Sequence, residues 1–160
     1  MIIKYISLFA VALAFGYFTK EYVNSAKQKA REYMAVRDFI AFAKRRLGGF
    51  LEPVPELCRA FSSEISEELK CPFTAALADA DIASACDSLE YFDMEDKRRL
   101  ASLFSSLGTG FREEETEALG TAFCYFDERC TAVGEDTEKK KRLAPSLFSL
   151  AFLALLIFFL

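Results

Sequence analysis

The sequence predicts an all-α protein, a helical bundle flanked by an apolar helix at each end of the chain. Apolar residues recur every three or four positions through most of the 160 residues, the period of an amphipathic helix. Alternation typical of a strand never extends beyond four residues, and no hairpin dipeptide occurs. The chain is 52% hydrophobic and 28% charged, and these two kinds of residue occupy different segments.

Charge is distributed in blocks along the chain. Residues 1–19 hold one cation, residues 20–49 have a net charge of +5, and residues 50–138 have a net charge of −14. Residues 139–142 are all cations, and residues 143–160 carry no charge. A nucleic-acid-binding protein would carry its cations on the folded middle, so we expect no nucleic-acid partner.

The first apolar segment predicts a transmembrane helix over residues 1–19. As a helix it measures about 28 Å, close to the roughly 30 Å hydrocarbon core of a bilayer, with Lys4 reaching the interface. A secretory signal peptide is the alternative, because "ALA" at 12–14 resembles a cleavage site. The charged start before it is short, so we favour the uncleaved span.

The second apolar segment predicts a transmembrane helix over residues 143–160, about 27 Å long. A core helix of a small domain would need a polar face toward water, and this run has none. Pro145 lies where the helix would enter the headgroups, and we expect a bend there because proline removes a helix hydrogen bond.

Cations lie on the inner side of both predicted spans. Lys20 follows the first span, and Lys139, Lys140, Lys141 and Arg142 precede the second. Cations mark the cytoplasmic side of a membrane. We therefore expect residues 20–142 to form a domain in the cytoplasm, both termini to lie outside, and the polybasic run to contact anionic lipids.

The middle of the chain predicts a series of helices. An apolar face runs through residues 26, 30, 33, 36, 40, 43 and 47, and Gly48-Gly49 is expected to end this helix. A second helix restarts with Pro55 in its first turn and carries Leu57, Phe61, Ile65 and Leu69 as its stripe. Shorter helices are expected over 72–80 and from Asp81 onward.

Two further helices complete the domain. Asp93 is the expected N-cap of a helix with Leu100, Leu103, Phe104 and Leu107 on one face and Gly108 after it. Arg112 begins a long helix with the stripe Leu119, Phe123, Phe126, Cys130 and Val133, which is expected to continue into the apolar tail. Phe111, Phe123 and Phe126 are expected in the core rather than at an interface.

The side chains needed for chemistry are sparse. The chain has no histidine, and its five cysteines form no Cys-x-x-Cys pair, so neither a metal site nor a cofactor is predicted. We expect the cysteines to act as small reduced hydrophobes. The carboxylates of "REEETE" (112–117), Glu67/Glu68 and Asp79/Asp81 are expected to face solvent. With no phosphate loop or nucleophile elbow, no small-molecule substrate or catalytic residue is predicted.

The order of these segments resembles the stage III sporulation protein AB family of endospore-forming bacteria. The resemblance rests on "GGFLEPVPELCRAF" (48–61) and "DMEDKRRLASLFSSLGTGFREEETEAL" (93–119) between the two apolar helices. The positions that match the family motif are Pro53, Val54, Pro55, Glu56, Leu57, Asp93, Leu107, Gly108, Arg112 and Glu113. The family's last helix usually contains glycines, and this one has none.

The resemblance implies a non-enzymatic component of the channel complex between mother cell and forespore. Its cytoplasmic domain would be similar to that of the type II secretion F protein. The expected partners are other subunits of that complex, among them its ATPase subunit, together with membrane lipids. Two alternatives remain: a small holin-like membrane-active protein, suggested by the two apolar ends, and a metal-dependent enzyme, suggested by the acidic middle.

Overall fold

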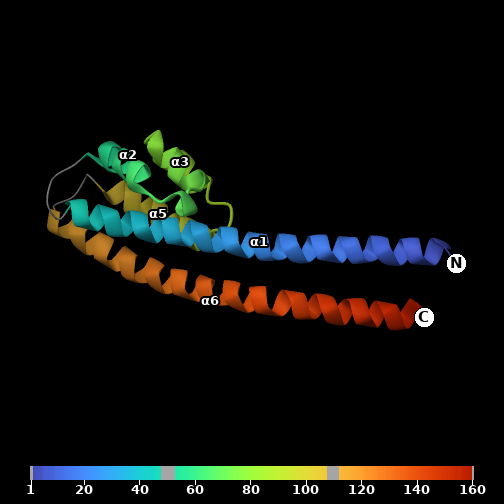
Figure 1. The fold of residues 1–160 in the computed structure, drawn as a ribbon. Coiled ribbons are helices and arrows are strands. Elements are labelled where there is room, and N and C mark those ends of the chain that lie inside the picture. Colours follow the sequence, from blue (N-terminus) through green and yellow to red (C-terminus); the bar gives the residue numbers. More distant parts are fainter. Residues whose placement is uncertain (1, 48–52, 108–111, 160) are drawn as a thin grey trace. The chain divides into compact units, whose positions relative to one another are not determined.

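The computed structural model describes residues 2–47, 53–107 and 112–159, and every secondary-structure element among them is a helix (Figure 1). The elements are α1 (Ile2–Leu47), α2 (Val54–Glu64), the short 3₁₀ helix η1 (Glu67–Leu69), α3 (Pro72–Ala78), α4 (Ile82–Asp87), α5 (Met94–Ser106) and α6 (Arg112–Phe159). Within these ranges, only the backbone is described for residues 2–9, 47, 112, 155, 156, 158 and 159. The all-α prediction is confirmed.

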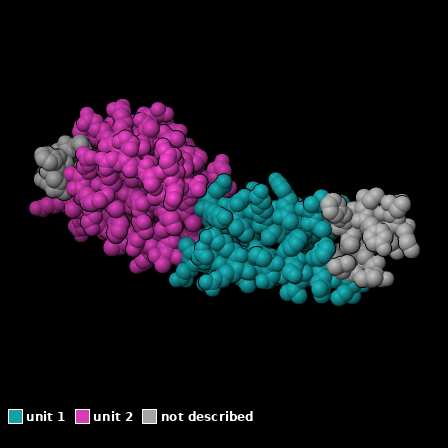
Figure 2. Space-filling model, viewed as in Figure 1, with its two compact units in different colours: residues 1–28, 134–160 teal, residues 29–133 magenta. Residues whose placement is uncertain are grey.

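The chain divides into two compact units (Figure 2). Unit 1 comprises Met1–Gln28 and Gly134–Leu160, and unit 2 comprises Lys29–Val133. The boundaries fall inside α1 and α6, because each of these long helices contributes to both units. The helix from Arg112 continues into the apolar tail, as expected, and the first apolar segment likewise continues as helix into the middle of the chain.

Unit 2 contains a closed apolar core. The predicted faces of its helices are buried, including Tyr33, Val36 and Ile40 of α1 and Leu100 of α5, all with no exposed surface. The thiols of Cys58, Cys86 and Cys130 lie among these apolar side chains, as small hydrophobes do. Burial of these faces is the main contribution to the stability of a helical unit of this size.

Aromatic rings form the centre of this core. Phe39 of α1 lies with its ring centroid 5.3 Å from that of Phe61 in α2, 6.3 Å from that of Phe73 in α3 and 5.3 Å from that of Phe104 in α5. One side chain of α1 therefore joins three other helices. Phe126 is buried as predicted, Phe123 is half-buried against the core, and Phe111 lies outside the described residues.

The second helix ends earlier than its apolar stripe predicted. α2 stops at Glu64, and Ile65 has extended backbone angles (φ −68°, ψ 141°). Ile65 and Leu69 of η1 are nevertheless half-buried, although neither belongs to α2. Cys71 is extended as well, because a residue before proline avoids the helical region, so a helix could not run on into Pro72.

A Schellman motif ends α3 two residues before the predicted Ala80. The Asp81 N–H donates to the Ala76 carbonyl (3.3 Å) and the Ala80 N–H donates to the Leu77 carbonyl (3.0 Å). Ala80 takes the left-handed conformation (φ 57°) that this motif usually gives to glycine. Asp81 then caps α4, since its carboxylate accepts from the Ser84 N–H (3.0 Å).

Unit 1 is an antiparallel pair formed by the beginning of α1 and the end of α6 (Figure 1). The Thr137 hydroxyl donates to the Ala26 carbonyl (3.1 Å), and the Lys140 ammonium lies 5.4 Å from the ring centroid of Tyr22. α6 continues through Pro145 without interruption of the helix. Over the described residues, no helix combines the length and the apolar character needed to cross a membrane.

Candidate functional site

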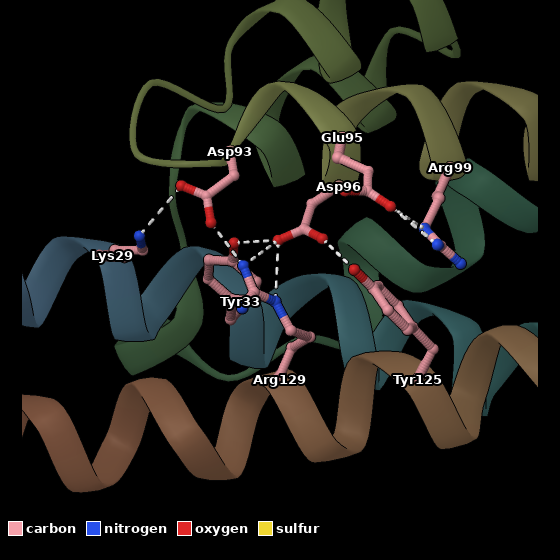
Figure 3. A network of polar contacts seen from close by, with 8 residues as sticks. All are labelled: Lys29, Tyr33, Asp93, Glu95, Asp96, Arg99, Tyr125 and Arg129. Atoms are coloured by element: carbon pink, nitrogen blue, oxygen red, sulfur yellow. Dashed lines mark hydrogen bonds and ion pairs between the residues drawn. The ribbon is translucent and has the colours of Figure 1, made fainter.

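A polar network joins three helices inside unit 2 (Figure 3). Asp96 of α5 is its centre and is only 1% exposed. Its partners are Tyr33 of α1 and Tyr125 and Arg129 of α6. The network therefore connects helices that are distant in the sequence.

Both oxygens of the Asp96 carboxylate accept hydrogen bonds. The Tyr125 hydroxyl donates to Oδ1 (2.5 Å), and the Tyr33 hydroxyl donates to Oδ2. Arg129 donates to Oδ2 from Nε (3.1 Å) and Nη2 (2.8 Å). Charge-assisted hydrogen bonds of this kind are stronger than neutral ones, and a buried carboxylate requires them.

These bonds keep Asp96 ionised. Burial by itself raises the pKa of Asp96, but the hydrogen bonds from Tyr125, Tyr33 and Arg129 outweigh it and hold the pKa below its ordinary value. The pKa of Tyr33 is raised by burial and by its hydrogen bond to Asp96. The pKa of Arg129 is raised mainly by its hydrogen bond to Asp96. All three side chains thus keep their usual charges at neutral pH.

Around this centre lies a second layer of ion pairs. Asp93 pairs with Lys29 (3.4 Å) and with Arg129, and Arg99 pairs with Glu95 (2.8 Å) (Figure 3). The Arg99 guanidinium also lies 4.4 Å from the ring centroid of Tyr125. Asp93 occupies the predicted N-cap position of α5, but its carboxylate makes no capping hydrogen bond and serves these ion pairs instead.

A second buried carboxylate lies on α1. Glu32 is 5% exposed and accepts a hydrogen bond from the Tyr91 backbone N–H (3.0 Å). Burial raises the pKa of Glu32, and the backbone hydrogen bonds from Tyr91 and Glu90 oppose that rise only in part. The pKa values of the two carboxylates therefore shift in opposite directions. Burial has the larger effect on the pKa of Glu32, and hydrogen bonding has the larger effect on the pKa of Asp96.

The geometry of the network is that of a structural clamp. Donors occupy the Asp96 oxygens, and the raised pKa of Tyr33 keeps its hydroxyl protonated. Among the described residues, no group of three or more cysteine, aspartate or glutamate side chains is placed to hold a metal ion. The chemical capacity of this cluster is to fix α1, α5 and α6 together.

A groove lies beside the clamp, between α5 and α6 within unit 2. Its volume is about 550 Å³. Leu103, Ala118 and Phe126 give it an apolar floor, and Glu114 and Glu117 contribute carboxylates. Arg99 and Tyr125 of the polar network also line the groove, so its charged lining residues include both signs.

A second groove lies within unit 1, between the beginning of α1 and the end of α6, with a volume of about 720 Å³. Aromatic and aliphatic side chains such as Phe15, Phe18 and Leu147 line most of it. Lys140 and Glu21 are its charged lining residues.

The residues of the predicted family motif lie at the ends of helices. Pro53 is the N-cap of α2, Pro55 is in its first turn with exposed Glu56, and Leu57 is fully buried. Leu107 is the buried C-cap residue of α5, and Arg112 is the first residue of α6. Gly108, like Gly48 and Gly49, lies outside the described residues. The residues around Pro53 belong to α2, whereas Leu107 and Arg112 belong to α5 and α6.

The predicted topology residues lie in unit 1. Lys20, Lys139 and Arg142 are exposed, whereas Lys140 and Lys141 are half-exposed. Lys139 pairs with Glu135 (3.8 Å), Lys140 with Asp136 (2.7 Å) and Lys141 with Glu138. Each pair lies one turn apart on α6, where such pairs contribute little to stability.

The clamp was not predicted from the sequence, although the spacing along α5 indicated that Asp96 would be buried. Asp96 stands four residues before Leu100, so it continues the buried face of α5. Most of the carboxylates expected in solvent are exposed, but Glu115 is 7% exposed, and for it the expectation was wrong. Comparisons of the chain with protein-family models, curated proteins and solved structures give no match.

Proposed function

We propose that the protein is a non-enzymatic, membrane-anchored docking module of the stage III sporulation protein AB type. In this proposal unit 1 attaches the chain to the bacterial cell membrane, on the mother-cell side of the forespore. Unit 2 presents a rigid helical surface in the cytoplasm. The sequence resemblance at 48–61 and 93–119 motivates the assignment to this complex.

One observation carries the membrane attachment. Ten of the twelve large apolar side chains that are exposed among the described residues belong to unit 1. They are Leu13, Phe15, Tyr17, Phe18, Tyr22, Leu143, Leu147, Leu150, Leu153 and Ile157. Such a concentration is unfavourable in water and is typical of a membrane or protein contact. The uncharged run 143–160 extends this apolar surface in the sequence.

Basic residues support an orientation for this unit. Lys20 of α1 and the run Lys139, Lys140, Lys141 and Arg142 of α6 lie between the apolar segments and the acidic middle. Because cations remain on the cytoplasmic side, this arrangement favours unit 2 in the cytoplasm and both termini outside. Pro145 follows the basic run and is proposed to mark the entry into the headgroup region.

The groove between α5 and α6 is the proposed docking surface for other channel subunits, among them the ATPase subunit. The Asp96 clamp lies next to it, since Tyr125 belongs to both. A surface held by such a clamp loses little conformational entropy when a partner binds, so a fixed groove favours docking.

The membrane attachment is tested with the full chain in bacterial membranes. We expect it to resist carbonate extraction, and reporter fusions to report both termini outside the cytoplasm. Release by carbonate, or a cytoplasmic C-terminus, contradicts the proposal.

The docking surface is tested by photo-crosslinking in membranes of sporulating cells. A crosslinking amino acid at Ser102, which lines the groove, is expected to give one adduct with another channel subunit. The matched control is Ser63, an exposed α2 residue that does not line the groove. Equal crosslinking from both positions, or none from Ser102, contradicts docking at the groove.

A further inference from the structure

We propose that the groove of unit 1 binds one anionic phospholipid, with its phosphate at Lys140 and an acyl chain between α1 and α6. This inference rests on the proposed membrane attachment and goes beyond it, because it assigns a defined lipid site to the chain. The binding surface is the groove of about 720 Å³ described above.

The lining of the groove changes from polar to apolar along its length. On α1 the lining residues run from Ser25 and Tyr22 to Phe15, and on α6 they run from Lys140 to Ala151. Because the two helices are antiparallel, both polar ends lie at one end of the groove and both apolar ends at the other (Figure 1). This division matches an amphiphile, which has one polar head and an apolar chain.

Lys140 is placed to receive the phosphate. Its side chain is 31% exposed, and its ammonium lies 2.7 Å from the Asp136 carboxylate and 5.4 Å from the ring centroid of Tyr22. An ammonium has three donors, so contact with Asp136 leaves donors for a phosphate. Lys139 and Lys141 flank it in the sequence, and Arg142 follows Lys141. The charges of these three residues add to the local attraction for an anion.

Glu21 is the lining residue that opposes an anionic headgroup. It lies at the polar end of the groove, one position after Lys20. Its presence makes the inference testable in both directions, because removal of Glu21 is expected to strengthen binding and removal of Lys140 is expected to weaken it.

The volume of the groove suits part of a lipid. Small-molecule sites in proteins have volumes of about 300–1,000 Å³ and mostly apolar walls. A groove of about 720 Å³ can take the first part of one acyl chain while the remainder extends into the bilayer.

Native mass spectrometry of the full chain in detergent micelles tests the inference. The chain is titrated with dioleoylphosphatidylglycerol and, separately, with dioleoylphosphatidylcholine. We expect the first phosphatidylglycerol to bind about tenfold more tightly than the first phosphatidylcholine. Equal binding of the two lipids overturns the inference.

Two charge variants locate the headgroup. Lys140→Gln is expected to weaken binding of the first phosphatidylglycerol about fivefold, the effect of one cation near an anionic lipid. Glu21→Gln is expected to strengthen it. Lys139→Gln is the matched control, because Lys139 is exposed and does not line the groove. An equal loss in Lys139→Gln indicates general attraction by the basic run and overturns a site at Lys140.

A further pair locates the acyl chain. Ala151→Phe fills the apolar end of the groove and is expected to weaken binding of both lipids. Ala154→Phe places the same ring on an exposed part of α6 that does not line the groove. If the two variants bind phosphatidylglycerol equally well, the acyl chain does not occupy the groove.

Flotation with vesicles separates failure of the inference from failure of the proposed function. The full chain is mixed with vesicles of phosphatidylcholine and phosphatidylglycerol and centrifuged through a density gradient. A chain that floats with the vesicles but shows no lipid preference overturns the lipid site alone. A chain that stays at the bottom of the gradient overturns the membrane attachment.

Discussion

Asp96 keeps its charge inside unit 2 because four hydrogen bonds replace the water that it loses on folding. The donors come from α1 and α6, whereas Asp96 belongs to α5. An ionised carboxylate without such partners would be strongly destabilising in this position. The charge of Asp96 is therefore stabilised only when α1, α5 and α6 are packed together.

Asp96→Asn is expected to destabilise the protein by about 2–3 kcal/mol. The neutral amide loses the charge-assisted bonds, and its NH₂ group cannot accept a hydrogen bond from Tyr33 or Tyr125. Thermal unfolding of the full chain in detergent micelles measures the loss. Asp93→Asn is the control, because Asp93 is 54% exposed and its ion pairs should contribute less than about 1 kcal/mol.

The effect of Asp96→Asn is also expected to depend on pH. The folded-state pKa of Asp96 is lowered, so its contribution is complete above the unfolded value of about 3.9 and is lost as the pH falls through the folded pKa. The difference between variant and wild type should thus be constant above about pH 5 and decrease in stronger acid. A difference that persists unchanged in acid contradicts this assignment.

Glu32→Gln is expected to stabilise the protein at neutral pH, whereas Asp96→Asn is expected to destabilise it. Burial raises the pKa of Glu32, so its contribution is favourable below the unfolded value of about 4.3 and is lost as the pH rises through the folded pKa. Glutamine keeps an acceptor for the Tyr91 N–H and carries no charge. At pH 7 the variant should be more stable by a few tenths to about 1 kcal/mol, with the gain lost near pH 4. Thermal unfolding at the two pH values measures it.

Cysteine reactivity is expected to follow burial. Burial raises the pKa of Cys58 and of Cys86 to about 11, so at pH 8 roughly one such thiol in a thousand is a thiolate. Cys124 is exposed on α6. In the folded chain, Ellman's reagent should modify Cys124 rapidly and the other four thiols slowly. The variant Cys124→Ser should lose the fast phase. A fast phase that remains contradicts the buried placement of Cys58, Cys86 and Cys130 and the half-buried placement of Cys71.

The end of α3 shows how an element can be stable in spite of its sequence. Ala80 holds a left-handed conformation that costs an L-residue roughly 1–2 kcal/mol. The two hydrogen bonds of the Schellman motif and the capped start of α4 at Asp81 hold it there. A position of this kind usually carries glycine.

Ala80→Gly is therefore expected to stabilise the protein by up to about 1 kcal/mol. The gain from relieved strain exceeds the entropy that glycine adds to the unfolded chain, about 0.4–1 kcal/mol. Ala78→Gly is the control, because Ala78 is an exposed residue of α3 with helical geometry and should lose about 0.5–1 kcal/mol. Thermal unfolding of both variants tests this, and a loss of stability in Ala80→Gly contradicts it.

The helices were largely predictable from the sequence, whereas the clamp was not. The apolar faces of α1, α5 and α6 indicated the core of unit 2 correctly, because helical periodicity reports directly on burial. The ends of α2 and α3 were misplaced because a short stripe cannot distinguish a helix from a turn that packs on the same face. Asp96 and Arg129 were missed because their pairing depends on the packing of α5 against α6, and no local pattern encodes it.

The two units differ in where their apolar side chains lie. Unit 2 buries its aromatic and aliphatic side chains around Phe39, whereas unit 1 leaves many of its own exposed. Unit 2 therefore has a core of its own, whereas the exposed apolar side chains of unit 1 are of the kind found where a protein contacts a membrane or a partner. This difference underlies both the proposed anchor and the proposed lipid site.

The fragment 29–133 is expected to fold alone, without detergent. Its core is complete, and Asp96 finds all of its hydrogen-bond partners within those residues. Circular dichroism should show helix together with ordered aromatic side chains, and unfolding should be cooperative. The fragment retains the partners of Asp96. Asp96→Asn should therefore destabilise the fragment by about 2–3 kcal/mol, as it should the full chain. A fragment with helix but no cooperative transition, or an Asp96→Asn effect confined to the full chain, would show that unit 2 depends on residues of unit 1.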